Sequence, residues 1–470
     1  MRFIQVAAIG IIFSLFGYRL SAESLSDIYQ LALNNDSQIK AERAQYKAQK
    51  EQKYIALAPL LPQMNASYRL QNQDSTTARE SISFSSNGSL VAVDTITKTD
   101  TEIDGYEVRV DQALFDLSAW FTFAAGKQLS KQAEASFAAN QQNLIVRVVE
   151  AYLEVLRSKD SLAASRAQER AFIKQLEQSQ QRFEVGLIAV TDVYEASAAK
   201  DLAEVKRIID QNKVAVALER LSVLTGQPHN ELNKLKEDFN VSLPDPMDRA
   251  QWVEFALKNN FSLHASQAAE EAARQNSRAF RAKHSPIVRG RYSYSDYDLT
   301  GNLSRTPATG FDTVPDQIEE TESWVIELTV PLSSGGAISA NRRRAAQEFN
   351  AARQERINLT RNTVAKTRSL HMTVVSDVSR VQARKQSIIS SISALDATQA
   401  GYEVGTRNVV DVLNAQNALF AAKRDYANSR YDYISNLLLL KEQAGIITPD
   451  DIFSLDSHLQ PIGPVTLSSQ

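Results

Sequence analysis

The sequence, 470 residues long, contains no cysteine. Disulfides, thiolate metal sites and a lipidated N-terminal cysteine are therefore excluded. The five histidines are scattered, and no two of them stand at the spacing of a metal-binding pair. An HExxH motif and a glycine-rich phosphate loop are also missing. We accordingly expect no catalytic residue, no cofactor and no bound metal.

The sequence also has few turn-forming residues and only a small net charge. Glycine (16) and proline (12) are scarce for this length, which predicts long helices with few turns. The formal net charge is only −3 and both signs are mixed along the chain, so we expect no nucleic-acid partner. Hydrophobic residues make up 43% of the chain, which is enough for a folded protein.

The first 22 residues have the composition of a secretory signal peptide. Arg2 precedes an apolar core, and the small residues Ser21 and Ala22 follow it. No later apolar run approaches the 18 residues or so that a membrane-spanning helix needs. We therefore expect an exported protein that carries no helical anchor after cleavage.

The rest of the chain is duplicated. Residues 183–226 align without a gap with residues 402–445, so that Gly186 matches Gly405 and Asp192 matches Asp411. We divide the chain into a signal peptide (1–22), a first repeat (23–226), an inter-repeat linker (227–249), a second repeat (250–445) and a C-terminal tail (446–470). Each repeat is expected to hold two strands and one tip hairpin: strands at about 64–84 and 102–116 with a hairpin at about 183–192, and strands at about 287–300 and 320–333 with a hairpin at about 402–411.

Each repeat should also contain a very long helix. From about Ser118 to Phe183 there is no proline and only one glycine, while apolar residues recur at three-four spacing, as at Leu144, Val148 and Tyr152. Such a helix would be roughly 100 Å long. Residues from about 339 to 402 look equivalent, so we expect the helices to pack side by side as a coiled-coil-like layer.

The expected strands alternate between apolar and polar residues. Trp324, Ile326 and Leu328 share one face with Glu327 on the other, which suits either a membrane barrel with a wet lumen or a half-buried sheet in a soluble protein. Four strands are fewer than the eight or so of the smallest ordinary barrel, so a barrel must be shared between subunits and continue into a helical tube. The polar segments 71–101 and 299–318 are expected to be external loops.

Four stretches resemble the TolC family of outer-membrane efflux and type I secretion channels, over essentially the whole mature chain. They are APLLPQ (58–63), QALFDLSAW (112–120), QRFEVGLIAVTDV (181–193) and GYEVGTR with VDVL (401–413). The resemblance implies a mainly α protein with a membrane β-barrel segment: a homotrimer whose twelve-stranded barrel, four strands per chain, continues into a periplasmic α-helical tunnel. It also implies the cell outer membrane, its lipid, a periplasmic adaptor (membrane fusion protein) and an inner-membrane ABC or proton-driven pump.

By the same resemblance the protein is an export duct that performs no chemistry. It would carry proteins by type I secretion, small toxic compounds such as drugs, or both, and its gate would lie at the periplasmic tip. Two other hypotheses stay open: a secreted coiled-coil structural or adaptor protein without a pore, and a periplasmic hydrolase with a helical stalk.

The two tip hairpins are the candidate gate. Gly186 and Gly405 fit a helix-ending position with positive φ, and Asp192 and Asp411 are expected to cap the returning helices, with Glu195 completing a capping box for Asp192. In the family, a Thr-Asp pair on one hairpin is linked to a Tyr and an Arg on the other. The matching gate-latch residues here are Thr191, Asp192, Tyr402 and Arg407.

Two further sets follow from the resemblance. The family's constriction carries two rings of acidic residues one helical turn apart; here the first is Asp411 but the second position is Asn414, so we expect a weaker cation preference. The adaptor-binding tip would comprise Val185, Gly186, Leu187, Val404, Gly405 and Thr406. Helix capping alone for the aspartates, a water-facing role for Asn414 and turn geometry alone for the tips are the competing interpretations.

Overall fold

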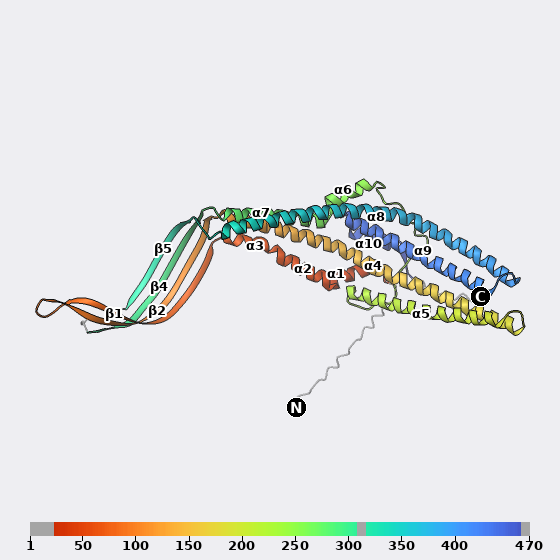
Figure 1. The fold of residues 1–470 in the computed structure, drawn as a ribbon, viewed down its shortest axis with the longest axis horizontal. Coiled ribbons are helices and arrows are strands. Elements are labelled where there is room, and N and C mark those ends of the chain that lie inside the picture. The colour runs from red at the N-terminus through yellow and green to blue at the C-terminus, as the bar shows by residue number, and fades with distance from the viewer. Residues whose placement is uncertain (1–22, 308–315, 462–470) are drawn as a thin grey trace, which may run out of the picture. The chain divides into compact units, whose positions relative to one another are not determined.

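The computed structural model describes residues 23–307 and 316–461. The predicted signal peptide and the last nine residues of the predicted tail lie outside the described residues. The chain divides into two compact units (Figure 1). The hairpin unit comprises the chain up to Arg43, Phe137–Phe261 and the chain from Arg361 onward, and the sheet unit comprises Ala44–Ser136 and Ser262–Thr360.

The elements follow the duplicated order that the sequence predicts, with helices and strands in alternating groups. In chain order they are α1 (Leu25–Asn35), α2 (Ser37–Lys50), α3 (Gln52–Leu57), η1 (Ala58–Leu60), β1 (Gln63–Phe84), β2 (Leu90–Phe115), α4 (Leu117–Glu184), α5 (Val190–Thr225), β3 (Lys234–Leu235), α6 (Arg249–Asn259), α7 (Phe261–Ala282), β4 (Ile287–Thr306), β5 (Gln317–Thr329), α8 (Ala337–Glu403), α9 (Val409–Gln443), α10 (Pro449–Asp456) and β6 (Leu459–Gln460). Among the described residues, no helix is long and apolar enough to cross a membrane.

The two long helices are confirmed. α4 has 68 residues and α8 has 67, each unbroken by proline. The apolar seam predicted on α4 is the centre of the hairpin-unit core, since Leu144, Val148 and Tyr152 are all fully buried. The single early glycine of α4 also has a packing reason: a Cβ at Gly126 would stand 2.5 Å from that of Ala56, so α3 and α4 approach closely there.

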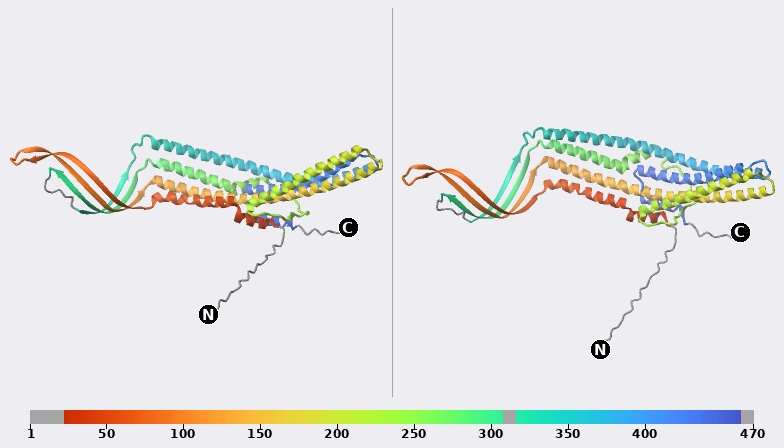
Figure 2. Two further views of the ribbon diagram at one scale, coloured as in Figure 1. Left: turned by 90° about the horizontal axis from the view of Figure 1, so that it is seen from below. Right: turned by 60° about the horizontal axis from the view of Figure 1, so that its bottom comes forward.

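Within the hairpin unit, each long helix turns back on a shorter one. α5 runs beside the C-terminal part of α4, and α9 runs beside that of α8 (Figures 1 and 2). The phenol of Tyr431 on α9 donates to Asp160 on α4 at 2.6 Å. Burial raises the pKa of Tyr431, as does the neighbouring carboxylate, so the phenol keeps the proton that it donates.

The duplication is visible in how the shorter helices end. The side-chain amide of Asn35, the last residue of α1, donates to the carbonyl of Thr225 at the end of α5, at 2.8 Å. The amide of Asn260, after α6, donates in the same way to the carbonyl of Gln443 at the end of α9, at 2.9 Å. Each repeat therefore caps its own returning helix with an asparagine from its first helical break.

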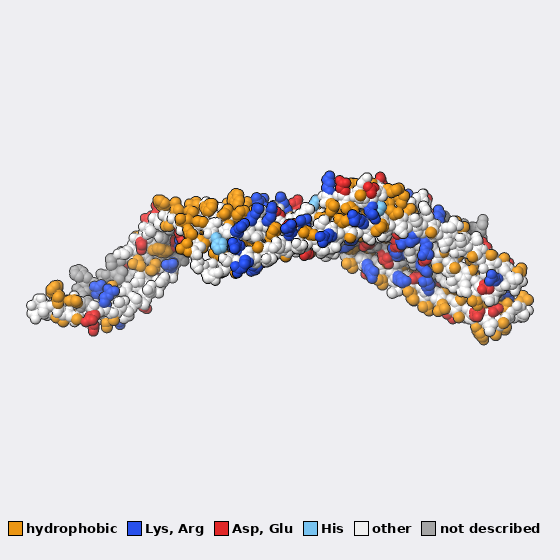
Figure 3. All heavy atoms as spheres, turned by 45° about the horizontal axis from the view of Figure 1, so that its top comes forward, with side chains coloured by type: hydrophobic (Ala, Val, Ile, Leu, Met, Phe, Trp, Pro, Cys, Tyr) orange, Lys and Arg blue, Asp and Glu red, His pale blue; other side chains and the backbone are white. Residues whose placement is uncertain are grey.

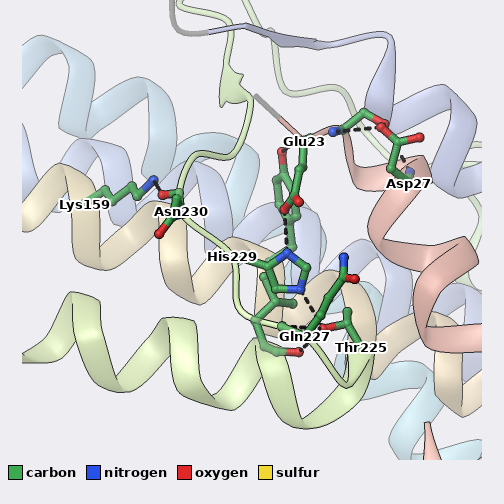
Figure 4. A network of polar contacts seen from close by, with 10 residues as sticks. Glu23, Asp27, Lys159, Thr225, Gln227, His229 and Asn230 are labelled. Carbon is green, nitrogen blue, oxygen red and sulfur yellow. Dashed lines mark hydrogen bonds and ion pairs between the residues drawn. The ribbon is translucent and has the colours of Figure 1, made fainter. Parts of the chain in front are cut away.

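The segment that links the repeats is held by polar contacts (Figure 4). His229 is buried, with Nδ1 paired to Glu23 at 2.5 Å and Nε2 paired to Thr225 at 2.6 Å. Lys159 donates to the carbonyl of Asn230 at 2.9 Å. The short strand β3 pairs with β6, so the linker lies against the part of the C-terminal tail that follows α10.

The sheet unit holds one antiparallel sheet with the strand order β1-β2-β4-β5. The predicted external loop at 71–101 is wrong, because β1 and β2 stay paired from Gln71 and Ile103 to Phe84 and Leu90. β2 therefore begins at Leu90 rather than near residue 102. The threonines favour this extended hairpin, but many polar residues interrupt the regular apolar–polar alternation that predicts a strand.

The second hairpin differs from expectation at both ends. β4 continues to Thr306, so the first part of the predicted loop 299–318 is strand; residues 308–315 of that loop lie outside the described residues. β5 ends at Thr329 rather than near residue 333, because Pro331 has no N–H to donate to a neighbouring strand. The apolar face of β5 is open: Trp324, Ile326 and Leu328 are 75%, 62% and 63% exposed.

Candidate functional site

Both hairpins of the hairpin unit turn through the same hydrogen-bonded corner. In the first, Gly186 (φ +77°) donates to the carbonyl of Phe183 and Leu187 donates to that of Arg182. In the second, Gly405 (φ +79°) donates to the carbonyl of Tyr402, and Thr406 donates to that of Gly401. This is the Schellman pattern, whose positive φ only glycine adopts cheaply. The prediction for both glycines is confirmed.

The capping prediction is wrong for Asp192 and holds only in part for Asp411, since neither aspartate is the N-cap residue of its helix. α5 begins at Val190 with Ala189 as its N-cap, so Asp192 lies in the first turn and makes no cap with Glu195. α9 begins at Val409, and its N-cap is Asn408, whose side chain accepts from the N–H of Asp411 at 2.9 Å. The helices start earlier than the sequence suggests because the Schellman corners take only a few residues. Each aspartate still lies at the positive end of its helix.

Asp411 keeps a capping function as the reciprocal partner of Asn408. Its carboxylate accepts from the N–H of Asn408 at 3.3 Å, which completes a capping box, and lies 3.9 Å from the guanidinium of Arg407. Asn414 follows one turn later and is exposed. The first position of the expected constriction is thus a partly buried, partly neutralised carboxylate, and the second is a neutral amide.

Tyr402 is the most enclosed of the four predicted latch residues. It is 5% exposed and belongs to a small apolar cluster with Phe172, Val409 and Val412. Among the described residues its buried hydroxyl has no hydrogen-bond partner. A buried phenol usually has a hydrogen-bond partner. The hydroxyl of Tyr402 is therefore an unsatisfied donor within the described part of a single chain.

Arg182, on the first hairpin, contacts Tyr402 on the second. The sequence did not lead us to predict this residue as part of the site. Its guanidinium lies 4.5 Å from the centre of the Tyr402 ring, and Nη1 donates to the Tyr402 carbonyl at 3.3 Å. Beside this pair is a hollow of about 390 Å³ lined by Gln178, Gln181, Arg182, Val185, Gln399, Tyr402 and Glu403. The alignment of the two repeats contained a signal for Arg182, because the first repeat has this cation directly before Phe183 where the second repeat has Gly401.

A single chain does not bring the four latch residues together. In the described parts of the chain, no bond joins Thr191 or Asp192 to Tyr402 or Arg407. Thr191 and Arg407 are exposed, and the only recorded charged partner of Arg407 is Asp411 on its own hairpin. Beside the latch positions, one chain does join its two hairpins through the contact of Arg182 with Tyr402.

The predicted adaptor-binding tip is open to solvent. Its apolar side chains Val185, Leu187 and Val404 are 69%, 70% and 76% exposed. A Cβ at either Gly186 or Gly405 would meet nothing within 4 Å, so only backbone conformation requires glycine there. Elsewhere, residues 23–307 and 316–461 contain no group of three His, Asp or Glu side chains that could hold a metal ion.

Comparisons with known proteins match both repeats. The family model described as outer membrane efflux protein matches residues 28–227 and 252–445. The chain is 32% identical over 443 residues to outer membrane protein TolC of Vibrio cholerae serotype O1, covering 93% of this chain and 94% of that one. It is 28% identical over 439 residues to alkaline protease secretion protein AprF of Pseudomonas aeruginosa, covering 92% and 86%.

A solved structure shows the same fold at lower identity. A crystal structure of CusC matches with a TM-score of 0.72 and 16% identity, covering 90% of this chain and 92% of that one. The family model leaves a gap between its two matched stretches where the inter-repeat linker lies. Because that model matches most of the chain, the protein belongs to the outer membrane efflux protein family.

Proposed function

We propose that this chain forms an export duct across the outer membrane of a Gram-negative cell, and the observation that carries the proposal is its open sheet. β1 and β5 each have one edge without a partner strand in the described chain. The apolar side chains Trp324, Ile326 and Leu328 of β5 are exposed. Unpaired backbone groups are not tolerated in lipid, so the sheet has to be closed by copies of itself.

Three copies would close this sheet into a barrel of twelve strands. The resemblance to the TolC family implies this number, and the match to the outer membrane efflux protein model and to the fold of CusC supports a channel of this kind. In the assembly, β1 of one subunit would pair with β5 of the next, which leaves no free edge. α4 and α8 with their shorter partners would form the wall of a periplasmic tunnel, and the duct would perform no chemistry.

The duct would serve both protein secretion and the export of small toxic compounds. Support comes from two relatives that match nearly the whole chain, one named TolC and the other an alkaline protease secretion protein. A wide polar passage does not select its cargo, so selection is left to a periplasmic adaptor and an inner-membrane ABC or proton-driven pump. We propose the exposed corners at Val185–Leu187 and Val404–Thr406 as the surface that the adaptor contacts.

The gate would lie at these same hairpins. In a closed trimer, Asp192 of one subunit would pair with Arg407 of the next, and the unsatisfied hydroxyl of Tyr402 would find an acceptor on Thr191 or Asp192. Each such bond contributes about 1 kcal/mol net, so three copies hold the gate without making it irreversible. Inside the gate, Asp411 would form the single acidic ring of the constriction, with Asn414 as a neutral ring beside it.

The gate is testable with disulfides because the chain has no cysteine of its own. We expect Asp192→Cys with Arg407→Cys to cross-link neighbouring subunits and to stop export until a reductant is added. The control pair, Tyr194→Cys with Arg407→Cys, places the first thiol on the exposed face of α5 and should not cross-link. Equal cross-linking of both pairs, or of neither, would contradict the latch.

The duct itself is tested in cells. In a Gram-negative strain without its own duct, expression of this chain should restore both drug resistance and secretion of a type I substrate, provided that the matching pump and adaptor are supplied. Restoration of only one would restrict the function to that pathway. Failure of both, with the protein present in the outer membrane, would refute export.

A further inference from the structure

The sheet unit carries a concentration of positive charge where its helices adjoin the strands. Residues 272–290, from the end of α7 into β4, contain four arginines and one lysine but no acidic residue. Residues 329–347, from the end of β5 into α8, contain Arg342, Arg343 and Arg344 and again no acidic residue. These two segments contribute to one surface, because α7 and α8 lie side by side (Figures 1 and 2).

Part of this surface is hollowed. A hollow of about 450 Å³ lies between the two helices, lined by Ser277, Arg281, Arg342, Arg343 and Ala346. All three arginines are exposed, and among the described residues none of them has a recorded ion pair or hydrogen bond. We call this feature the arginine hollow.

Neighbouring cations on the same helices, unlike those of the arginine hollow, form ion pairs. Arg356 pairs with Glu270, Arg274 with Glu271 and Arg344 with Glu348. The charges of the arginine hollow are therefore not the ordinary salt-bridge pattern of a solvated helix face. Three guanidinium groups and a serine hydroxyl around one space offer donors without an acceptor, which is the arrangement that suits a phosphate group.

Aromatic rings lie next to the cations in this unit. Phe280 on α7 has Lys283 at 4.5 Å and Arg344 at 5.9 Å from its ring centre. The pattern recurs on the other helices that adjoin the sheet, with Lys127 at 4.9 Å from Phe123 on α4 and Lys53 at 5.4 Å from Tyr54 on α3. Rings paired with snorkelling cations are typical of the layer where lipid headgroups meet water.

The exposed apolar residues of β5 continue to the start of α8, the helix that carries Arg342 and Arg343. Along the chain, the exposed stripe of Trp324, Ile326 and Leu328 leads to Leu332, which is 93% exposed, and α8 begins five residues later. Figure 3 shows Lys and Arg side chains along the α7 and α8 part of the surface, beside a band of hydrophobic side chains toward the strands. Acyl chains against the stripe would thus place headgroups beside these cations.

We propose that the arginine hollow binds the phosphate of an anionic phospholipid in the periplasmic leaflet of the outer membrane. The proposal rests on the barrel proposed above, because that barrel defines which side of the strands faces the periplasm. Anionic lipid is favoured over free phosphate because the hollow adjoins aromatic rings and a lipid-suited stripe. The lipid would fix the depth at which the duct sits and would tie α7 to α8 beneath the barrel.

The test compares lipid retention by the full-length trimer and by a charge-removed variant. Purified protein is titrated with phosphatidylglycerol or phosphatidylcholine, and bound lipids are counted by native mass spectrometry. The variant is Arg281→Gln, Arg342→Gln, Arg343→Gln. Its control is Arg353→Gln, Arg361→Gln, Lys366→Gln, which removes three exposed cations from α8 away from the hollow.

We expect the hollow variant to bind phosphatidylglycerol roughly a hundredfold more weakly, since it loses three cations and each cation near an anionic headgroup contributes about fivefold. The control variant and the phosphatidylcholine titrations should be unchanged. Displacement of the lipid by millimolar inorganic phosphate alone would identify a free-phosphate site and overturn the proposal. Equal loss in both variants would also overturn it, because the effect would then be one of net charge.

Planar-bilayer currents from the same samples separate this proposal from the proposed duct. A hollow variant that conducts normally but loses its lipid supports the lipid site. A shift of reversal potential without lipid loss would place the arginines in the lumen and refute it. If the glutamine variant does not assemble, the corresponding triple lysine variant keeps the charge, and it should retain the lipid more weakly than the unchanged protein. If the lysine variant retained the lipid as well as the unchanged protein, the phosphate would not be bound through the paired N–H groups of the guanidiniums, and the proposal would be refuted.

Discussion

Replacing Arg182 with glutamine should open the gate, because Arg182 on the first hairpin contacts both the ring and the carbonyl of Tyr402 on the second. Glutamine keeps a polar side chain but removes the charge over the ring and the guanidinium bond to the Tyr402 carbonyl. The cation–π pair contributes about 0.5–2 kcal/mol at a half-buried site, and the hydrogen bond contributes about 1 kcal/mol. Because the side-chain amide of glutamine can still donate to that carbonyl, most of the loss comes from the cation–π pair, and we take it as ~1–2 kcal/mol for each chain.

Three chains multiply this loss if the gate opens as a unit. The closed state would then lose ~3–6 kcal/mol, which lowers the closed-to-open equilibrium constant by roughly 10²–10⁴. The assay is the open probability of single channels in planar bilayers, with Arg170→Gln as the control. Arg170 is an exposed cation on the same helix with no recorded partner in the described chain.

A second variant separates Arg182 from the latch between subunits. Tyr402→Phe removes the hydroxyl but keeps the ring on which Arg182 stacks, so the effects of Arg182→Gln and Tyr402→Phe should add. An open probability in Arg182→Gln no higher than in Arg170→Gln would refute the reasoning. It would mean that the stack persists when the gate opens and contributes equally to both states.

Three further predictions follow from other contacts. Asn414→Asp restores a second acidic ring and should shift the reversal potential in a KCl gradient toward cation selectivity; an unchanged potential would place Asn414 away from the pore. Gly405→Ala strains a φ of +79° and should cost about 1 kcal/mol, seen as faster hydrogen exchange of the Thr406 amide, and unaltered protection would contradict the corner. Tyr431→Phe leaves Asp160 without its donor and should lower stability to denaturant by about 1–3 kcal/mol, whereas the exposed Tyr194→Phe should not; equal midpoints would contradict the buried bond.

The sequence was most informative where periodicity and glycine chemistry coincide. α4 and α8 follow from long stretches without proline and from an apolar seam that is fully buried. The two corners follow from Gly186 and Gly405, because a helix that reverses in a few residues needs a positive φ. Both signals are local, so they can be recognised without knowing the partners in space.

Other features depend on contacts that a linear pattern does not contain. The stack of Arg182 on Tyr402 joins residues 220 positions apart, and nothing in either neighbourhood requires it. The long β1–β2 hairpin has only scattered apolar residues, such as Ile82 and Phe84, so its polar residues were interpreted as a loop. The N-caps of α5 and α9 were misplaced because aspartates in the first turn resemble capping residues in the sequence.

Single-channel conductance of the purified protein tests the central claim most directly, measured beside an Arg407→Ser, Tyr402→Phe variant. The duct proposal predicts a small, mostly closed current from the unchanged protein and a much larger current from the variant. Equal, wide-open currents would keep the pore but move the gate away from the hairpins. The absence of any channel in both proteins would contradict the proposal that this chain forms a duct.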